Sequence, residues 1–247
     1  HSECPGYYVI RNFIDESFAS HMVNFWTAEL PLSDQTHERI EKMDKPNIFY
    51  RYCPNYVYPN VYGTTYFNWW WNKPYDEVTY GVAWKINEFR NTVMSKNFFL
   101  RFFPETENRS TGFRVVQTTT GENIVPMHTD WDGENSFDPS AIQATLILSN
   151  FGEDYDGEGM IFKTNQGKEI VPNRDLDLKK GDLILWKYTN EHAVRNVTTK
   201  AGQIGFLRLI FPPEWFYETP AEKKFANASK KELMAELKRR VKRKLVS

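Results

Sequence analysis

The sequence predicts a mainly β domain flanked by helices, and two observations carry this prediction. Between residues 98 and 217 the chain breaks into short runs rich in apolar, β-branched and aromatic side chains, separated by Gly, Asn and Asp. Many short strands with turn residues between them are typical of an all-β sandwich or barrel. Two earlier stretches have apolar residues at helical spacing. We therefore expect two helices packed against the outside of a β core.

The first elements are a strand and a helix. Residues 7–13 form a β-branched and aromatic run that is typical of a strand. Asp15 follows it and can cap a helix that ends near Ala28. The apolar face of this helix consists of Phe18, Met22, Phe25 and Trp26.

Residues 31–74 predict an irregular segment rich in Tyr, Asn and Pro, and they include the run Trp69, Trp70 and Trp71. A long aromatic loop can serve as a lid or as a wall of a substrate pocket. The alternative is that its rings pack over the core. Both interpretations stay open at the level of the sequence.

A second helix is expected from about Tyr75 to Met94. Its apolar stripe consists of Val82, Ile86, Phe89 and Val93. The β region then follows, with expected strands at 99–103, 112–118, 124–128, 141–149, 159–163, 168–172, 182–187, 192–198 and 204–211.

Length and charge set the domain organisation. The 247 residues suffice for one domain with a full hydrophobic core. We expect a single domain over 1–220, with a helical N-terminal part at 1–97 and the β core at 98–217, followed by a basic helix at 221–247. That last segment has ten Lys and Arg against three Glu, a local charge of +7, so residues 1–220 carry −8. Docking of this helix on the acidic body is the simplest interpretation.

Composition also limits the class of protein. The formal net charge is −1, which argues against extensive binding to nucleic acid. Two cysteines are too few for a disulfide framework, and no apolar run is long enough to span a membrane. We therefore expect a cytoplasmic protein with no membrane association.

Three residues point to a metal site. His128 and Asp130 form a His-x-Asp motif, and His192 follows 62 residues after Asp130. A short His-x-Asp step lets one strand end present two ligands side by side, and a His on a neighbouring strand can complete a facial triad. Two imidazoles and one carboxylate suit iron(II) and leave three coordination positions open. Each His also needs a hydrogen bond to its second ring nitrogen, which Thr129 or Asn190 could provide.

The motifs around these residues resemble the iron(II)/2-oxoglutarate-dependent dioxygenases, and within them the prolyl-4-hydroxylase-like branch. The resemblance covers about residues 112–212. Its motifs are Val-Pro-Met-His-Thr-Asp-Trp (125–131), Ala-Thr-Leu-Ile-Leu-Ser-Asn (144–150), Tyr-Asp-Gly-Glu-Gly-Met-Ile-Phe (155–162), Lys-Gly-Asp-Leu-Ile-Leu-Trp (180–186) and His-Ala-Val-Arg-Asn-Val (192–197). The family implies a double-stranded β-helix, a cupin-like jelly roll, with iron held in one mouth by His128, Asp130 and His192.

The resemblance also implies 2-oxoglutarate as cosubstrate and O₂ as oxidant, so the protein needs a cation for the far carboxylate of the cosubstrate. Arg208 lies within an apolar strand, where an unpaired guanidinium is costly, so it demands an anionic partner. Either 2-oxoglutarate or an internal Asp or Glu could meet this demand. The family commonly places its basic residue where Ile204 stands, and Ile204, Phe206 and Arg208 share strand parity.

Hydroxyl groups could steady the same carboxylate. The candidates are Thr118, Thr119, Thr120 and Thr145. A Thr-rich strand is often simply a strand, so these assignments are weaker than that of Arg208. Trp131 and Trp186, with the three consecutive tryptophans, are candidate walls of the pocket.

The resemblance implies an oxidoreductase that converts 2-oxoglutarate and O₂ to succinate and CO₂ while it hydroxylates a C–H bond. Asp130 argues against halogenation, because related halogenating enzymes have a small residue there. We expect a small molecule as substrate, such as an amino acid or a natural-product intermediate. A peptidyl hydroxylase and a non-catalytic metal-binding jelly roll remain alternatives, and nucleic acid is not expected.

Overall fold

The structure is a computed structural model that describes residues 4–29, 48–51, 64–70, 73–95, 109–110, 112–121, 125–130, 142–211 and 215–216. The expected strand at 99–103 and the basic helix at 221–247 lie outside the described residues, as do Trp71 and Trp131.

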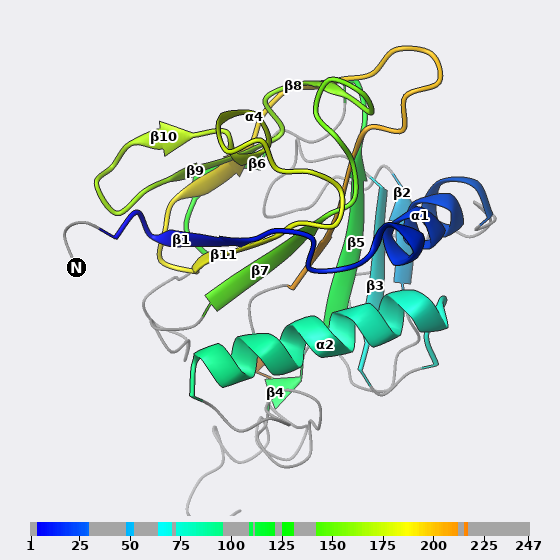
Figure 1. The fold of residues 1–247 in the computed structure, drawn as a ribbon, viewed down its shortest axis with the longest axis horizontal. Coiled ribbons are helices and arrows are strands. Elements are labelled where there is room, and N and C mark those ends of the chain that lie inside the picture. The colour runs from blue at the N-terminus through cyan, green and yellow to red at the C-terminus, as the bar shows by residue number, and fades with distance from the viewer. Residues whose placement is uncertain are drawn as a thin grey trace, which may run out of the picture.

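Two antiparallel sheets form the core (Figure 1). The larger has the strand order β1 (Tyr7–Ile10), β11 (Leu183–Lys187), β7 (Ile142–Ile147), β14 (Phe206–Ile210), β5 (Gly112–Thr118), β3 (Thr64–Trp69) and β2 (Ile48–Arg51). The smaller has the order β10 (Glu169–Ile170), β9 (Met160–Lys163), β12 (His192–Val194) and β6 (Val125–His128). Two short pairs join β13 (Val197–Thr198) to β8 (Asp156–Gly157) and β15 (Trp215–Phe216) to β4 (Arg109–Ser110).

The strand pairs from β5 to β14 are nested in the manner of a jelly roll. Apart from the two-residue strands β8 and β13, the first strand pairs with the last (β5 with β14) and the second with the seventh (β6 with β12). The third pairs with the sixth (β7 with β11) and the fourth with the fifth (β9 with β10). This nesting defines the double-stranded β-helix, so the predicted fold class is confirmed.

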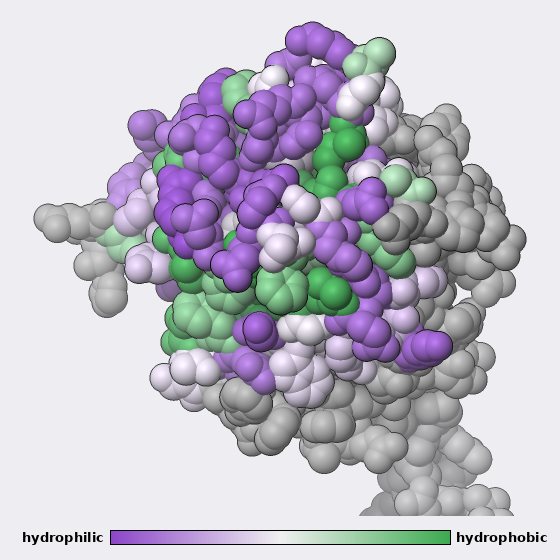
Figure 2. Space-filling view, turned by 45° about the vertical axis from the view of Figure 1, so that its right-hand side comes forward, coloured by the Kyte–Doolittle hydropathy of each residue, from purple (hydrophilic) through white to green (hydrophobic). Residues whose placement is uncertain are grey.

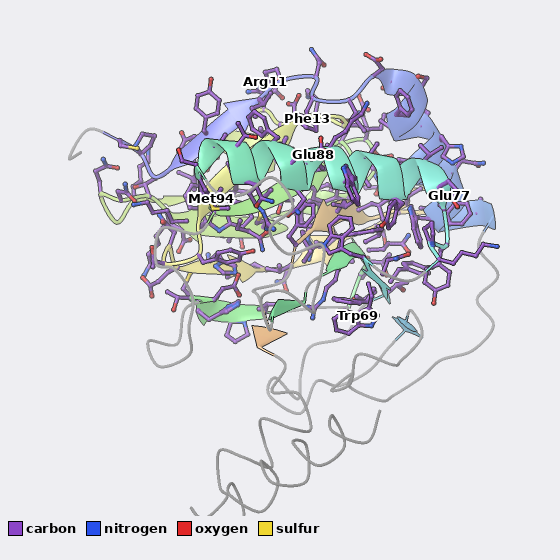
Figure 3. The ribbon with its side chains drawn as sticks, turned by 90° about the horizontal axis from the view of Figure 1, so that it is seen from below. Arg11, Phe13, Trp69, Glu77, Glu88 and Met94 are labelled. Atoms are coloured by element: carbon purple, nitrogen blue, oxygen red, sulfur yellow. The ribbon has the colours of Figure 1, made fainter. Side chains whose placement is uncertain are left out.

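Two helices cover the outer face of the larger sheet. α1 (Glu16–Asn24) continues as a π-helical turn, η1 (Phe25–Glu29), and α2 (Glu77–Val93) begins where the Asp76 carboxylate accepts the Thr79 N–H at 2.9 Å. Figure 3 shows α2 lying along the sheet, with Phe13 beside it. The rings of Phe13 and Phe89 are 5.9 Å apart. Both predicted helices are therefore present, each within a few residues of its expected bounds.

Strand alternation divides the side chains of the larger sheet between two cores. On β7, Ala144 and Leu146 pack under the helices, whereas Ile147 belongs to the core between the two sheets. On β14, Leu207 and Leu209 face the helices and Phe206 faces the inter-sheet core. Successive strand residues point to opposite faces, so Thr145 and Arg208 lie on the inner face. This places them inside the jelly roll.

The prediction of an irregular segment at 31–74 is wrong where the structure describes it. Strand β3 lies there and pairs along its whole length with β5, and all six of its residues are buried. Trp69 and Trp70 are buried as well, and the Trp70 ring lies 5.3 Å from that of Phe113. For these two tryptophans the packing interpretation holds. The pairing partner β5 is distant in sequence, so local composition did not reveal the strand.

The other strand boundaries differ in detail. The expected strand 168–172 is present as the shorter β10, and the short helix α4 (Pro172–Asp175) begins at a proline just after it. The expected strand 192–198 is divided into β12 and β13.

The described surface is mainly polar. Figure 2 shows polar side chains over much of one face, with apolar side chains in smaller patches between them. Large apolar side chains that are exposed among the described residues are Tyr8, Phe18 and Val93. No helix within the described part of the chain has the length and apolar character to cross a bilayer.

Candidate metal and cosubstrate site

The smaller sheet brings the His-x-Asp motif and the distant histidine together. His128 ends β6 and His192 begins β12, and the two residues are paired directly across these neighbouring strands. Their rings are 4.3 Å apart. Asp130 completes the cluster, with its two carboxylate oxygens 3.7 Å from His128 Nε2 and 3.5 Å from His192 Nε2. One ligand atom from each residue lies within 4.8 Å of the others, so a single ion could contact all three.

Backbone carbonyls orient both imidazoles. His128 Nδ1 lies 2.7 Å from the Pro126 carbonyl oxygen, and His192 Nδ1 lies 3.1 Å from that of Asn190. A carbonyl only accepts, so each Nδ1 donates its hydrogen, and in the neutral imidazole Nε2 is the nitrogen that could bind a metal. Of the two residues predicted for this role, Thr129 and Asn190, Asn190 takes it through its main-chain carbonyl. The acceptors are main-chain groups, which residue types do not reveal.

The two histidines differ in their electrostatics. Burial lowers the pKa of His128, but its contacts with the Asp130 carboxylate and the Pro126 carbonyl outweigh burial and leave the pKa raised. Burial dominates at His192 and lowers its pKa, because the Asp130 charge compensates only in part. The neutral form of His192 that a metal requires is therefore favoured.

On the larger sheet, Arg208 is buried without an anion among the described residues. Only 5% of its surface is exposed, and within the described ranges no carboxylate lies within 4.0 Å of it. Its guanidinium donates to Thr118 Oγ1 at 3.2 Å and lies 4.5 Å from the centre of the Phe206 ring. Burial lowers its pKa to about 10. The alternative of an internal salt bridge therefore finds no support among the described residues.

Two further hydroxyl groups lie on this side of the interior without a described partner. Thr145 Oγ1 and the Tyr155 hydroxyl are both buried and unbonded among the described groups. The Tyr155 ring packs on Phe206 at 5.1 Å, so Phe206 touches both Tyr155 and Arg208. Burial raises the pKa of Tyr155, and the charge of Arg208 acts in the opposite direction. Tyr155 lies in the motif at 155–162, but the sequence alone does not assign it a role.

The remaining threonine candidates do not share this environment equally. Thr118 contacts Arg208, whereas Thr120 is exposed and bonds to Thr199 with an oxygen–oxygen distance of 3.0 Å. Thr119 lies between Thr118 and Thr120 in the sequence.

The expected common parity of Ile204, Phe206 and Arg208 holds only for the last two. Ile204 packs against the helix-side core, on the opposite face. Between Ile204 and Phe206, Gly205 has φ +91°, and a Cβ atom there would come within 2.4 Å of the Thr118 carbonyl oxygen. This left-handed residue interrupts the alternation. The position where the family commonly has its basic residue therefore points away from the interior.

The donors fit the groups that the sequence analysis expected. Two imidazole nitrogens and one carboxylate around one point match the ligand set of a mononuclear iron(II) site with open positions. A buried guanidinium with unbonded hydroxyls nearby matches one end of a dicarboxylate. A separate hollow of about 270 Å³ is lined by residues such as Met127, Ala193 and Arg195 and by none of the three candidate ligands, so we do not assign chemistry to it.

The fold and the cluster together define a jelly-roll protein with a two-histidine, one-carboxylate candidate site. No protein-family model and no curated protein matches the chain. Solved structures similar to it include a prolyl-4-hydroxylase from Pseudomonas putida, with 13% identity, a TM-score of 0.49 and coverage of 87% of this chain and 93% of that one.

Two further solved structures are also similar to the chain. The collagen prolyl hydroxylase of Paramecium Bursaria Chlorella virus-1 has 14% identity and a TM-score of 0.44, over 85% of this chain and 94% of that one. The α-ketoglutarate-dependent epimerase SnoN from nogalamycin biosynthesis has 11% identity and a TM-score of 0.49, over 84% and 77%. All three likenesses are at 14% identity or less and concern the fold.

Proposed function

We propose that this protein is an iron(II)- and 2-oxoglutarate-dependent dioxygenase. One observation carries the proposal: the jelly roll holds a His-Asp-His cluster on its smaller sheet and a buried arginine without a described carboxylate on the inner face of its larger sheet. The cluster alone, or the buried arginine alone, is compatible with a purely structural role. A metal triad and a cation for the cosubstrate in one interior match the needs of a single reaction.

His128, Asp130 and His192 would hold the iron, which together with 2-oxoglutarate and O₂ would supply the power to oxidise a C–H bond. The chain itself contributes orientation. The carbonyls of Pro126 and Asn190 hold the imidazoles with Nε2 toward the metal. These fixed hydrogen bonds lower the cost of organising the ligands when the ion binds.

Arg208 would bind the far carboxylate of 2-oxoglutarate, with Thr118 beside it. Tyr155 and Thr145 offer further donors from the same interior. A charged hydrogen bond in a buried site is strong and directional, so this group would select a dicarboxylate over a shorter oxoacid.

For the substrate we propose a small molecule, such as an amino acid or a natural-product intermediate, and hydroxylation as the reaction. The described part of the 31–74 segment supports this choice. Strand β3, with Trp69, and the adjacent Trp70 belong to the core and not to a lid that could grip a peptide. The carboxylate of Asp130 in the cluster favours hydroxylation over halogenation.

The test is succinate formation by the iron-loaded chain with 2-oxoglutarate and O₂, screened against amino acids and against proline-containing peptides. The expected result is stimulation by a small molecule that Asp130→Ala abolishes. Stimulation by peptides alone would replace the substrate assignment. No succinate above that of Asp130→Ala, with or without any candidate, would contradict the enzyme assignment.

A further inference from the structure

One short turn contacts two of the three candidate metal ligands. It comprises residues 188–191, between β11 and β12. The carbonyl of Tyr188 accepts the backbone N–H of Asp130 at 3.2 Å, and the carbonyl of Asn190 lies 3.1 Å from His192 Nδ1. The carbonyl of Glu191 accepts the N–H of Lys163 on β9 at 2.8 Å. The place of this turn therefore affects how Asp130 and His192 are aimed.

The Tyr188 side chain fixes the turn to the layer behind the larger sheet. It is 1% exposed, and its hydroxyl donates to the Phe211 carbonyl at 3.4 Å. The same hydroxyl accepts from Arg90 Nη1 at 3.3 Å. Arg90 belongs to α2, so a chain of contacts runs from this helix through Tyr188 to the metal ligands.

Arg90 is itself buried, and its contacts among the described residues are with uncharged groups. It is 1% exposed, its guanidinium donates to Asn87 Oδ1 at 2.6 Å and it lies 4.7 Å from the centre of the Phe211 ring. Among the described residues its Nε atom has no hydrogen-bond partner, and no carboxylate lies within 4.0 Å of it. A buried charge without a counter-ion costs free energy, and apolar replacements of buried ions are often neutral or stabilising. Its contact with the Tyr188 hydroxyl gives this buried charge a connection to the 188–191 turn.

We propose that Tyr188 and Arg90 are positioning residues for the metal site. They hold the 188–191 turn so that Asp130 and His192 present their ligand atoms to one point. This inference rests on the proposed function, because it assumes that the cluster binds a metal. Beyond the proposed function, helix α2, on the far side of the larger sheet, would then control the geometry of the metal cluster.

The experiment is a cobalt(II) titration of the full chain, because the visible spectrum of cobalt reports both affinity and coordination geometry without any turnover. Tyr188→Phe removes only the hydroxyl. Tyr80→Phe is the matched control. Tyr80 lies on helix α2, which also carries Arg90; its hydroxyl donates to the Trp70 carbonyl at 2.6 Å and touches none of the candidate ligands. We expect cobalt to bind about 10-fold more weakly to Tyr188→Phe, with an altered spectrum, and unchanged to Tyr80→Phe.

A second variant tests the route of the effect. Arg90→Met should weaken cobalt binding in the unaltered chain but add nothing in the Tyr188→Phe background, because Arg90 acts through Tyr188. Equal weakening in both backgrounds would overturn that route, and equal cobalt affinity and spectra in all variants would overturn the whole inference while leaving the metal site intact. Failure of the folded, unaltered chain to bind cobalt or iron would instead reject the proposed function, and this inference with it.

Discussion

The two halves of the site are built in opposite ways. The metal half lies on two adjacent strands of the smaller sheet, where His128 faces His192 and Asp130 follows two residues later. The cosubstrate half collects Arg208, Thr118, Thr145 and Tyr155 from three strands of the larger sheet and from the segment before β8. The first half is marked by spacing and residue type. The second is marked by a buried guanidinium without a described carboxylate and by two buried hydroxyls without described partners, which only a three-dimensional arrangement reveals.

The largest effect is expected from removal of a metal ligand. Asp130→Ala leaves two imidazoles, and we expect iron(II) affinity and succinate formation to fall by roughly 100-fold or more, since even indirect partners of metal ligands are worth 10- to 100-fold. The melting temperature without metal should change little, because the side chain is partly exposed and lies two residues beyond the end of β6. Isothermal titration and thermal melting measure the two effects. Full turnover by this variant would contradict the metal half of the account.

Arg208→Met should affect the cosubstrate half of the site and leave the metal half unchanged. Loss of one partner of a buried charge pair costs about 3–5 kcal/mol, so the affinity for 2-oxoglutarate should fall by some 100-fold or more while iron affinity stays unchanged. Binding of 2-oxobutyrate, which lacks the far carboxylate, serves as the control and should hardly change. If 2-oxoglutarate binds this variant as well as the unaltered chain, its anchor is another residue.

Tyr155→Phe should have smaller effects. It should preserve or slightly raise the stability of the cosubstrate-free protein and should lower the affinity for 2-oxoglutarate. The hydroxyl is buried without a described partner, and replacing such a group by an apolar one of the same shape is neutral or stabilising, by up to about 1 kcal/mol. The metal-free, cosubstrate-free protein should therefore melt at the same or a slightly higher temperature. With 2-oxoglutarate the variant should bind a few-fold more weakly. A clear loss of stability without cosubstrate would show that the hydroxyl has a structural partner.

Particular residues show why the sequence predicted the metal half of the site, and the strands around it, better than the cosubstrate half. The strands around the motifs, such as β5 and β11, begin and end within two residues of their expected bounds, because alternation and turn residues are local signals. The nested pairing became predictable only through the resemblance of the motifs to a known family. Strand β3 was missed because its stability comes from pairing with β5, more than 40 residues away.

Two details of the site needed the structure for other reasons. Gly205 adopts a left-handed conformation that turns Ile204 away from Arg208, and strand parity counted along the sequence cannot include such an interruption. The acceptors for the imidazoles are backbone carbonyls, which every residue possesses. Tyr155 stands among acidic and glycine residues at 151–159, so the sequence gives no signal that its hydroxyl is buried.

An anaerobic titration tests the central claim most directly. Iron(II) and then 2-oxoglutarate are added to the metal-free protein, and the visible charge-transfer band of the iron–cosubstrate chelate is recorded. The account predicts that the band forms, that His128→Ala abolishes it and that Arg208→Met shifts its appearance to much higher 2-oxoglutarate concentrations. Iron binding without a band at any 2-oxoglutarate concentration would contradict the account and would leave a metal-binding jelly roll with a different function.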